Sequence, residues 1–568
     1  MRSGSAPTLM VTPSSEVIQI VFFLVVLLCA RYLFRWDRPS LPPGPRGWPL
    51  IGNSFDIPTH TVWQSFAQMG EKWGDLLSLT TFGKTIIIIN SFEVAEDLLE
   101  SRGGNFSDRP FLQMGGELVG FRNTLTFSQY GDRVRKERKL FHQLFGTSMA
   151  IERFLPLLRS EIREFLQNLL LNPDGAVVRY LPAWLPGGSF RTTANKWAKV
   201  IQDSINGPLG YVKDQMAAGT AEHSFSSALL QEQPDDDYLV KWAASSIYGA
   251  GTSTTSSQLE GFFLAMSLYP DVQAEAQREL DLVVGKDRLP DISDRPDLPY
   301  MNALCKEVLR WHNANPTGIP HRTREDFIYE RKGHPPVLIP KDSVIIPNIW
   351  YMAHDPKRYS DPMTFNPRRF LAMDTGEAEL DPSRIIFGYG RRICAGSCSP
   401  PVTVIRNLNE ALGKQFADTF IFLICSAVLS LFNINKASKN GVVVEPAVGQ
   451  TNGTVSFPQS DSVETRERYL GLARLESSKT GNRDISAYLL SKGANTRFVR
   501  VGRRFTGPTP LYYAADTNNF ELIKLLLASS SDPNLLAIYG FTPLYCATSN
   551  NNMAMVQAQL DAGADIYA

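Results

Sequence analysis

The sequence predicts a mainly helical protein of the α+β class, followed by a C-terminal helical segment of a different kind. Long helical stretches are predicted at about residues 132–145, 150–172, 238–268 and 296–312. Short strands separated by proline and glycine are predicted within 318–348, and residues 77–90 have the pattern of a hairpin turning at Gly83 and Lys84. Because the strands gather in one part of the chain, the pattern is α+β and not a βαβ alternation.

Length, charge and cysteine content narrow the class of protein. The chain has 568 residues, which exceeds one ordinary domain and is enough to bury a large core. Its 57 basic and 57 acidic residues balance, so the net charge gives no indication of a nucleic-acid partner and we expect none. The 6 cysteines are too few and too scattered for a disulfide framework. They predict reduced thiols in a cytosolic environment.

A membrane anchor is predicted at residues 17–36, with residues 1–16 on the lumenal side. Residues 17–30 are almost wholly apolar, and with the two arginines that follow the span reaches about twenty residues, enough to cross a bilayer. The competing interpretation is a cleaved signal peptide, but Arg2 is the only basic residue ahead of the span and no small-x-small cleavage site follows it. The arginines C-terminal to the span predict a single-pass protein of the endoplasmic reticulum membrane with a cytosolic body.

A stiff hinge is predicted directly after the anchor, at residues 37–53. Its prolines hold the backbone angle φ and cannot continue a helix; they are Pro42, Pro43, Pro45 and Pro49. Such a hinge would set the body at a defined angle to the membrane. A generic proline-rich linker is the alternative.

An internal repeat distinguishes the last part of the chain. The sequence TPLYYA at 509–514 recurs as TPLYCA at 542–547, a period of 33 residues. This spacing resembles that of ankyrin repeats, in which TPL opens a pair of helices. We place about two and a half units at 481–568, after a polar linker at 461–480; three units are usually needed for independent stability. A genuine fusion and a merged pair of neighbouring genes fit the sequence equally well.

The stretch FGYGRRICAG at 387–396 offers the chemistry of a haem-thiolate centre. A cysteine thiolate on haem iron favours cleavage of the O–O bond of dioxygen, and Cys394 is the candidate ligand. Gly390 and Gly396 would let the backbone pass close to a porphyrin, and Arg392 could pair with a propionate. The spacing F-x-x-G-x-R-x-C-x-G is complete, because Phe387 occupies its first position.

These residues resemble the cytochrome P-450 superfamily, and the order of motifs is most similar to fungal microsomal members of the O-methylsterigmatocystin oxidoreductase type. The resemblance covers about 41–460, with the haem-thiolate monooxygenase domain placed at 54–460. Glu307 and Arg310 match the E-x-x-R helix, where an offset of three residues puts both charges on one face. Arg369, in a P-x-R-F segment, is expected to complete a buried triad with them. A surface ion pair of little energetic value is the alternative.

Further elements match the family pattern in part. The segment 250–255 resembles the oxygen-binding helix: Thr254 is present, but Ser253 stands where the family has an acid, which puts proton delivery in doubt. A weakened Gly/Ser/Thr-rich helix is the alternative. Arg138 matches the arginine of W-x-x-x-R and could bind a propionate, although Val134 replaces the tryptophan. His321 resembles a residue at the haem edge, whereas His312, like His142, is interpreted as structural.

The chain departs from the family in two places. Residues 397–413, with Pro400 and Pro401, separate the cysteine loop from the helix that should follow, and we interpret them as an insertion from a small retained intron. Near residue 175, several helices found in similar proteins have no counterpart. Loss of buried apolar surface on this scale predicts that the chain folds poorly or binds haem weakly.

The resemblance implies a monooxygenase that oxidises an apolar small molecule, in fungal secondary metabolism or detoxification. It implies haem b as cofactor, O2 as oxidant, and electrons from NADPH delivered by an NADPH-cytochrome reductase. The alternative is a catalytically impaired remnant, or merged gene product, whose ankyrin segment binds a protein partner. Ser253, Val134 and the two departures favour that alternative; the complete cysteine loop and the E-x-x-R pair favour the enzyme.

Overall fold

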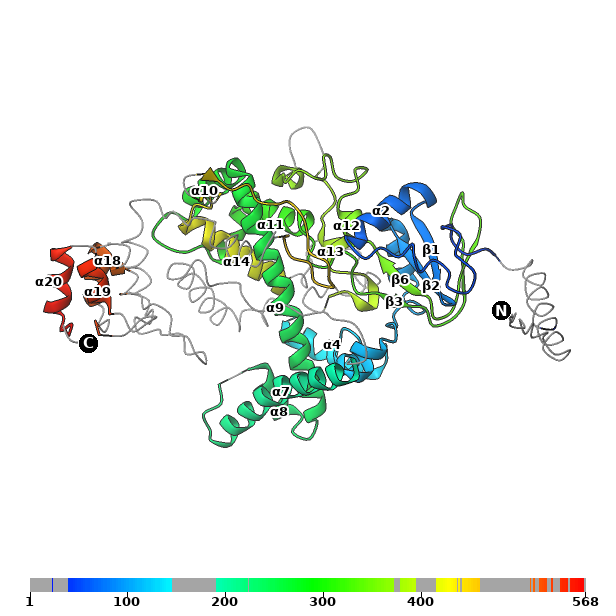
Figure 1. Ribbon diagram of the computed structural model, residues 1–568, viewed down its shortest axis with the longest axis horizontal. Coiled ribbons are helices and arrows are strands. Elements are labelled where there is room, and N and C mark those ends of the chain that lie inside the picture. Colours follow the sequence, from blue (N-terminus) through cyan, green and yellow to red (C-terminus); the bar gives the residue numbers. More distant parts are fainter. Residues whose placement is uncertain are drawn as a thin grey trace, which may run out of the picture.

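The protein is described by a computed structural model (Figure 1). It describes residues 39–145, 190–222, 224–371, 378–394, 415–436, 438–439 and 442–459, together with Phe23 and parts of 511–565. Several predicted features lie outside these residues: the anchor at 17–36 apart from Phe23, the helix at 150–172, the region near 175, the insertion at 397–413 and the linker at 461–480. None of the helices in the described part has the length and apolar character needed to span a membrane.

The predicted hairpin is present, but its turn lies one residue earlier than expected. Strand β1 (Leu76–Thr81) pairs antiparallel with β2 (Lys84–Ile89), and Lys84 already pairs with Thr81. The turn is therefore formed by Phe82 and Gly83, both with positive φ (46° and 77°). Positive φ at both central residues gives the turn a twist that matches the strands, which explains why the bulky Phe82 is held there.

The hairpin belongs to a four-stranded sheet in the order β1-β2-β6-β3. Strand β6 (Val344–Pro347) runs parallel to β2, and β3 (His321–Arg322) pairs antiparallel with β6. Two further pairs of short strands are β4 (Phe327–Tyr329) with β5 (Val337–Ile339) and β7 (Ser438–Lys439) with β8 (Val442–Val443). The strands predicted within 318–348 are thus confirmed, and they place His321 at an edge of the main sheet.

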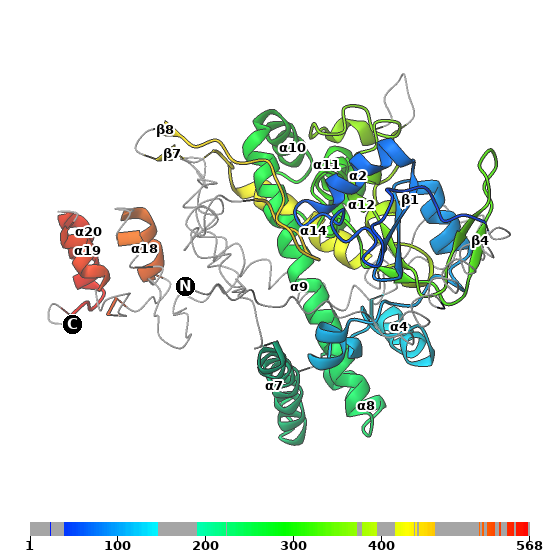
Figure 2. The same cartoon turned by 45° about the vertical axis from the view of Figure 1, so that its right-hand side comes forward.

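Helices form most of the remainder, as the sequence predicted. The longest, α9 (Asp237–Leu268), runs through the middle of the larger body (Figures 1 and 2). The predicted stretches 132–145, 238–268 and 296–312 agree with α4, α9 and α11 to within one helical turn. The described helices and helical turns are α2 (Val62–Trp73), α3 (Phe92–Ala95), η1 (Glu96–Ser101), η2 (Gln113–Leu118), η3 (Phe121–Asn123), α4 (Asp132–Phe145), α7 (Phe190–Ala217), α8 (Phe225–Glu232), α9, α10 (Pro270–Val283), η4 (Ile292–Asp297), α11 (Pro299–Trp311), α12 (Ile349–Ala353), η5 (Pro367–Phe370), α13 (Ser383–Ile386), η6 (Gly390–Arg392), α14 (Gln415–Leu431), α18 (Phe520–Ala528), α19 (Pro543–Ser549) and α20 (Met553–Asp561).

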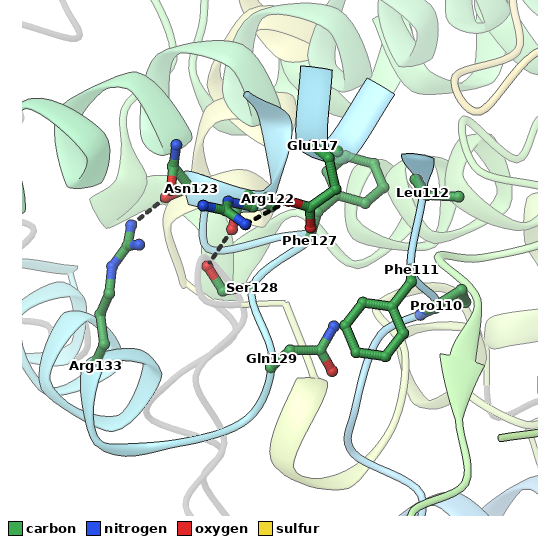
Figure 3. A pocket seen from close by; sticks show the side chains of 11 residues that line it. Pro110, Phe111, Leu112, Glu117, Arg122, Asn123, Phe127, Ser128, Gln129 and Arg133 are labelled. Atoms are coloured by element: carbon green, nitrogen blue, oxygen red, sulfur yellow. Dashed lines mark hydrogen bonds and ion pairs between the residues drawn. The ribbon is translucent and has the colours of Figure 1, made fainter. Parts of the chain in front are cut away.

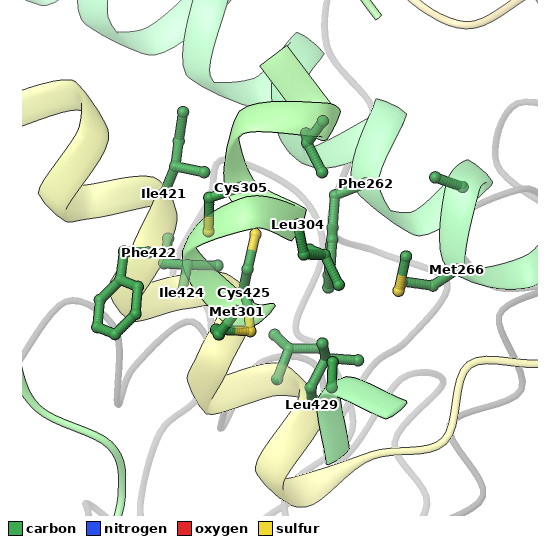
Figure 4. Packing of buried hydrophobic residues seen from close by; sticks show 14 of the residues in the cluster. Phe262, Met266, Met301, Leu304, Cys305, Ile421, Phe422, Ile424, Cys425 and Leu429 are labelled. Carbon is green, nitrogen blue, oxygen red and sulfur yellow. The ribbon is translucent and has the colours of Figure 1, made fainter. Parts of the chain in front are cut away.

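The largest hydrophobic core joins helices α9, α10, α11 and α14 (Figure 4). Helix α14 begins directly after the predicted insertion, and its inner side chains, such as Phe422 and Cys425, are fully buried. They pack against Phe262 of α9 and Cys305 of α11. The helix that the insertion separates from the cysteine loop therefore still occupies the core.

A buried ion-pair triad ties α11 to the segment that contains η5. The Glu307 carboxylate accepts hydrogen bonds from Arg310 (2.7 and 2.8 Å), from Arg369 (3.2 Å) and from the Asn366 backbone (2.8 Å). All three charged side chains are at most 1% exposed. The predicted E-x-x-R triad is thus present, and its burial excludes the alternative of a surface ion pair.

A hairpin at residues 449–459 is the last described segment of the larger body. Gln450 bridges Pro458, and Thr451 donates a backbone hydrogen bond to Phe457 (2.7 Å). At its exposed bend, Asn452 accepts a hydrogen bond from the backbone nitrogen of Thr61 (2.6 Å) at the start of α2 and donates one to His60 Nδ1 (3.1 Å). The hairpin therefore touches the N-terminal part of the body.

The described part of the repeat segment has a small core of its own. Leu511, Ala514, Ile523, Ala547 and Met555 are buried together. Thr542, the first residue of the second TPL motif, accepts a hydrogen bond at its hydroxyl from the Tyr545 backbone (3.3 Å) and so caps α19. The motif thus opens a helix, as the repeat pattern predicts.

The triad should contribute strongly to stability. We expect Arg369→Ala to lower the free energy of unfolding by about 3 kcal/mol, because it removes a buried ion-pair partner of Glu307. Its neighbour Arg368 is exposed and pairs only with Glu275 among the described residues, so Arg368→Ala should cost about 1 kcal/mol or less. Urea unfolding followed by tryptophan fluorescence compares the two; equal midpoints would contradict the structural role of Arg369.

Candidate active site

The cysteine loop is a closed turn that follows α13. The Cys394 backbone nitrogen donates to the Phe387 carbonyl (2.8 Å), and Gly388 and Gly390 have the positive φ angles that this turn requires. A Cβ at Gly390 would lie 2.3 Å from the Leu99 carbonyl oxygen of η1. Gly390 therefore allows close packing against η1, and its expected place beside a porphyrin stays a prediction.

Cys394 itself is exposed and forms no disulfide, whereas Cys305 and Cys425 are buried. The predicted iron ligand is therefore accessible to a ligand on a tightly held loop. Gly396, two residues further on, lies outside the described residues.

Arg392 is buried behind the loop. Its guanidinium donates to the carbonyls of Ser107 (2.7 Å), Leu125 (3.2 Å) and Ser128 (2.5 Å). Burial, together with the charge of Arg138, lowers the pKa of Arg392 to about 10. Arg392 remains charged at neutral pH, but its charge is poorly solvated.

Arg138, on α4, lies beside Arg392 and donates to the Ile393 carbonyl (2.7 Å), next to Cys394. Val134, in the place of the expected tryptophan, is fully buried. The two predicted arginines thus meet at the cysteine loop, from elements more than 200 residues apart in sequence.

A third arginine, Arg109, was not predicted. It donates to the carbonyls of Thr126 (2.9 Å), Ile319 (2.7 Å) and Pro320 (2.9 Å). Burial, followed by the charges of Arg392 and Arg138, lowers its pKa well below the usual value for arginine. Its partners are backbone carbonyls from distant segments, so no spacing in the sequence marks it.

His321 also lies beside these arginines, and the guanidinium of Arg322 donates to the Arg109 carbonyl (3.1 Å). His321 donates from Nδ1 to the Phe106 carbonyl (2.7 Å), and burial, followed by the charge of Arg109, lowers its pKa well below the usual value. The imidazole is therefore neutral. Arg322 also forms ion pairs with Asp108 (3.5 Å) and Asp342.

Arg109, Arg138 and Arg392 form what we call the cationic cluster. Among the described residues, their guanidinium groups donate hydrogen bonds only to backbone carbonyls. Burial of the Arg109 and Arg392 charges is costly, and the acids near Arg392 are already paired with other arginines, so this cluster favours a further anion. The two propionates of haem would supply it, close to a cysteine that can bind iron. The residues present therefore fit haem.

The candidate oxygen-binding segment lies in the middle of α9. Here the helix is exposed over residues 248–252, and a Cβ added at Gly249 or Gly251 would meet nothing within 4 Å. The Thr254 hydroxyl donates to the Ala250 carbonyl (2.7 Å), and Ser253 offers a hydroxyl in place of a carboxylate. Among the described residues, Thr254 hydrogen-bonds only within its own helix, so no direct contact joins it to the cationic cluster.

A pocket of about 360 Å³ adjoins the cluster (Figure 3). Its wall combines the aromatic rings of Phe111 and Phe127 with an ion pair between Arg122 and Glu117. Ser128 lines the pocket and also binds Arg392 through its carbonyl. One residue thus connects the pocket wall to the cationic cluster.

Comparison with known proteins decides the family. A family model described as cytochrome P450 matches residues 42–176 and 169–398. The chain belongs to the cytochrome P450 family. A second model, described as ankyrin repeats (3 copies), matches residues 475–568 of this P450 chain.

Similar curated proteins are fungal P450 monooxygenases. Cytochrome P450 monooxygenase 208 of Postia placenta is 40% identical over 493 residues, covering 77% of this chain and 92% of its own length. Monooxygenase claR of Ampulloclitocybe clavipes is 36% identical, covering 80% and 92%. Monooxygenase ppsD of Aspergillus oryzae is 32% identical, covering 80% and 95%.

The cationic cluster predicts how this P450 chain should discriminate between porphyrins. Haem dimethyl ester has no propionate charge, so we expect it to bind about tenfold or more weakly than haem. In Arg138→Gln this preference should shrink, because one charge-assisted contact is lost. Arg135, exposed on the same helix and paired with Asp132, provides the matched control Arg135→Gln. Absorbance titration measures the affinities of the parent chain and of both variants for haem and for its dimethyl ester. If Arg138→Gln prefers haem over the ester as strongly as the parent chain does, Arg138 does not contact a propionate.

Proposed function

We propose that this chain is a haem b-dependent monooxygenase that inserts one oxygen atom of O2 into an apolar small molecule. Electrons would come from NADPH through an NADPH-cytochrome reductase. The observation that carries this proposal is the accessible Cys394, held on a closed loop beside the buried Arg109 and Arg392 and the half-buried Arg138. The described hydrogen bonds of the three guanidinium groups go only to carbonyls. The fungal P450 monooxygenases among its relatives favour a role in secondary metabolism or detoxification.

Each residue contributes a separate part of the site. Haem, when bound, supplies the activation of dioxygen, which a thiolate ligand promotes. Cys394 provides that thiolate, and Arg109, Arg138 and Arg392 neutralise the propionates. His321, neutral and donating to Phe106, adds a ring beside the cluster without adding charge. Thr254, on the exposed face of α9, offers a hydroxyl that can pass a proton, while Ser253 cannot act as an acid.

The pocket beside the cluster supports an apolar substrate with a polar group. Its aromatic side chains, Phe111 and Phe127, offer apolar contact, and Arg122 and Glu117 are already paired with each other. A ligand that fills such a pocket gains mainly from apolar burial. The volume of about 360 Å³ suits a small molecule.

Two observations support the proposed departures from the family. The match to the P450 model falls into two pieces that overlap at residues 169–176, and it ends at residue 398, at the start of the proposed insertion. The alignment with monooxygenase 208 spans 493 positions but covers only 77% of the 568 residues here, so this relative carries residues without a counterpart. We therefore keep the retained intron at 397–413 and the missing segment near 175 as proposals.

An exposed apolar patch supports attachment to the endoplasmic reticulum membrane. The patch consists of Trp48, Leu50, Phe55 and Phe82, which are between 63% and 94% exposed. These residues lie together because Gly52 bridges Thr81 at the tip of the β1–β2 hairpin. The chain between the end of the proposed anchor, Trp36, and Trp48 of the patch can span at most about 40 Å. Exposed aromatic and leucine side chains at such a place suit the membrane interface.

The alternative remains a catalytically impaired chain whose repeat segment binds a protein. Ser253 and Val134 favour it, because one removes the expected acid and the other the expected indole N–H. Haem binding through Cys394 distinguishes the two functions.

The reduced carbon monoxide complex tests the proposed function. We expect the purified full-length chain to show the long-wavelength Soret band of thiolate-ligated haem, and Cys394→Ser to lose it. Cys398→Ser, four residues away, should keep the band. Absence of haem absorbance from the parent chain would favour the impaired alternative, and loss of the band only in Cys398→Ser would overturn the assignment of Cys394.

Photocrosslinking tests the membrane contact of the apolar patch. With p-benzoylphenylalanine in place of Phe82, the full-length chain in microsomes should form adducts with lipid acyl chains. The same replacement at Leu282, which is 81% exposed on α10, is the control and should form few. Mass spectrometry of the labelled peptides measures both. Equal lipid labelling at the two sites, or labelling of protein alone at position 82, would contradict a membrane-facing patch.

A further inference from the structure

His312, at the end of α11, lies in a buried chain of hydrogen bonds. The Gln450 side-chain nitrogen donates to His312 Nδ1 (2.9 Å), and His312 Nε2 lies 3.0 Å from the Ser257 hydroxyl oxygen. The Ser257 hydroxyl donates in turn to the Ser456 carbonyl. His312, Ser257 and Ser456 are each at most 2% exposed. We call these four residues the histidine clamp.

The groups at the two ends of the chain, the Gln450 amide nitrogen and the Ser456 carbonyl, fix the direction of each hydrogen bond between them. An amide nitrogen can only donate and a carbonyl can only accept. His312 Nδ1 is therefore the acceptor, so Nε2 carries the proton and donates to Ser257. Burial also lowers the pKa of His312 to about 4, which keeps the imidazole neutral. With this tautomer the hydrogen bonds from Gln450 to Ser456 run in one direction.

The clamp holds α9 on one side. Ser257 and Gln258 both belong to α9, and the Gln258 amide donates to the His312 carbonyl (2.9 Å). The imidazole ring packs directly on the helix backbone, because a Cβ at Gly261 would lie 2.7 Å from it. Three positions within about one turn of α9, Ser257, Gln258 and Gly261, therefore pack on a single histidine.

The clamp holds the 449–459 hairpin on the other side. Gln450 and Ser456 are part of this hairpin, and the Ser456 backbone nitrogen donates to the Ala314 carbonyl (2.8 Å). His312 is therefore enclosed between α9 and the hairpin. Removal of any one member would leave buried polar groups of the others without partners, which is costly.

The candidate oxygen-binding segment lies just before the clamp on α9. Residues 248–256 include Gly249, Gly251 and a run of serine and threonine, which are poor helix formers. At the other end of this segment, the Ser246 hydroxyl accepts a hydrogen bond from the Leu125 backbone (3.0 Å). An intrinsically weak, exposed stretch of helix is thus anchored at both ends.

We propose that His312 is a positioning residue that acts through Ser257 to hold α9 in register at Thr254, with the 449–459 hairpin completing the clamp. This inference rests on the proposed function, because Thr254 takes its role from there. It changes the interpretation of His312 from a packing residue to one that governs the oxygen-binding segment. The conformational restraint itself does not depend on haem.

Hydrogen exchange on the full chain tests the restraint. Ser257→Ala should raise exchange of the backbone amides in 248–256 about tenfold, because it breaks the link between α9 and His312. Ser426→Ala is the matched control: Ser426 is a fully buried serine whose hydroxyl bonds carbonyls of its own helix, α14. It should leave exchange in 248–256 unchanged. Gln450→Met, at the far end of the clamp, should raise exchange in the same window.

A second readout connects the clamp to the reaction. With a reductase and NADPH, Ser257→Ala should release more hydrogen peroxide per NADPH oxidised than the parent chain or Ser426→Ala, at equal haem content. The clamp would be overturned if exchange in 248–256 rose equally in Ser257→Ala and Ser426→Ala. It would also be overturned if exchange there rose in neither Ser257→Ala nor Gln450→Met. If Ser257→Ala and Gln450→Met raise exchange in 248–256 as expected but the chain binds no haem, the proposed function is refuted and the clamp is retained.

Discussion

The carboxylate of Glu307 is the interaction on which the rest of the body depends. Four hydrogen bonds converge on it, from two arginines and one backbone nitrogen, and the carboxylate is fully buried. Through Arg310 it also reaches the carbonyls of Ala353 and Pro362. Removal of one member would strand buried charge, so the arrangement behaves as a unit. It positions α11, whose C-terminal end carries His312 into contact with α9.

The second constraint is electrostatic and concerns a group that the polypeptide does not supply. Arg109 and Arg392 are desolvated next to the cysteine loop, with Arg138 beside them, and carbonyl dipoles satisfy their hydrogen-bonding without neutralising their charge. The polypeptide alone therefore leaves this region of the body incompletely stabilised. A dianionic cofactor held here would stabilise the folded state, because a ligand that binds only the folded state stabilises it.

Local patterns were readable from the sequence, whereas distant contacts were not. The Glu307–Arg310 pair and the Cys394 loop depend on fixed short spacings, and the structure places both as expected. Arg109 could not be found, because its acceptors at residues 126, 319 and 320 carry no side-chain signal. The hairpin turn was misplaced by one residue because Phe82 adopts a backbone angle that glycine would normally provide. His312 was interpreted as structural for a similar reason, since Gln450 lies far along the chain.

The contact of Asn452 with Thr61 and His60 joins positions that are 391 and 392 residues apart in the chain. The same hairpin encloses His312 through Gln450 and Ser456. Loss of the hairpin would therefore remove partners from the start of α2 as well as from the end of α11. A change late in the sequence can in this way reach the N-terminal helix of the body without any change in the residues between them.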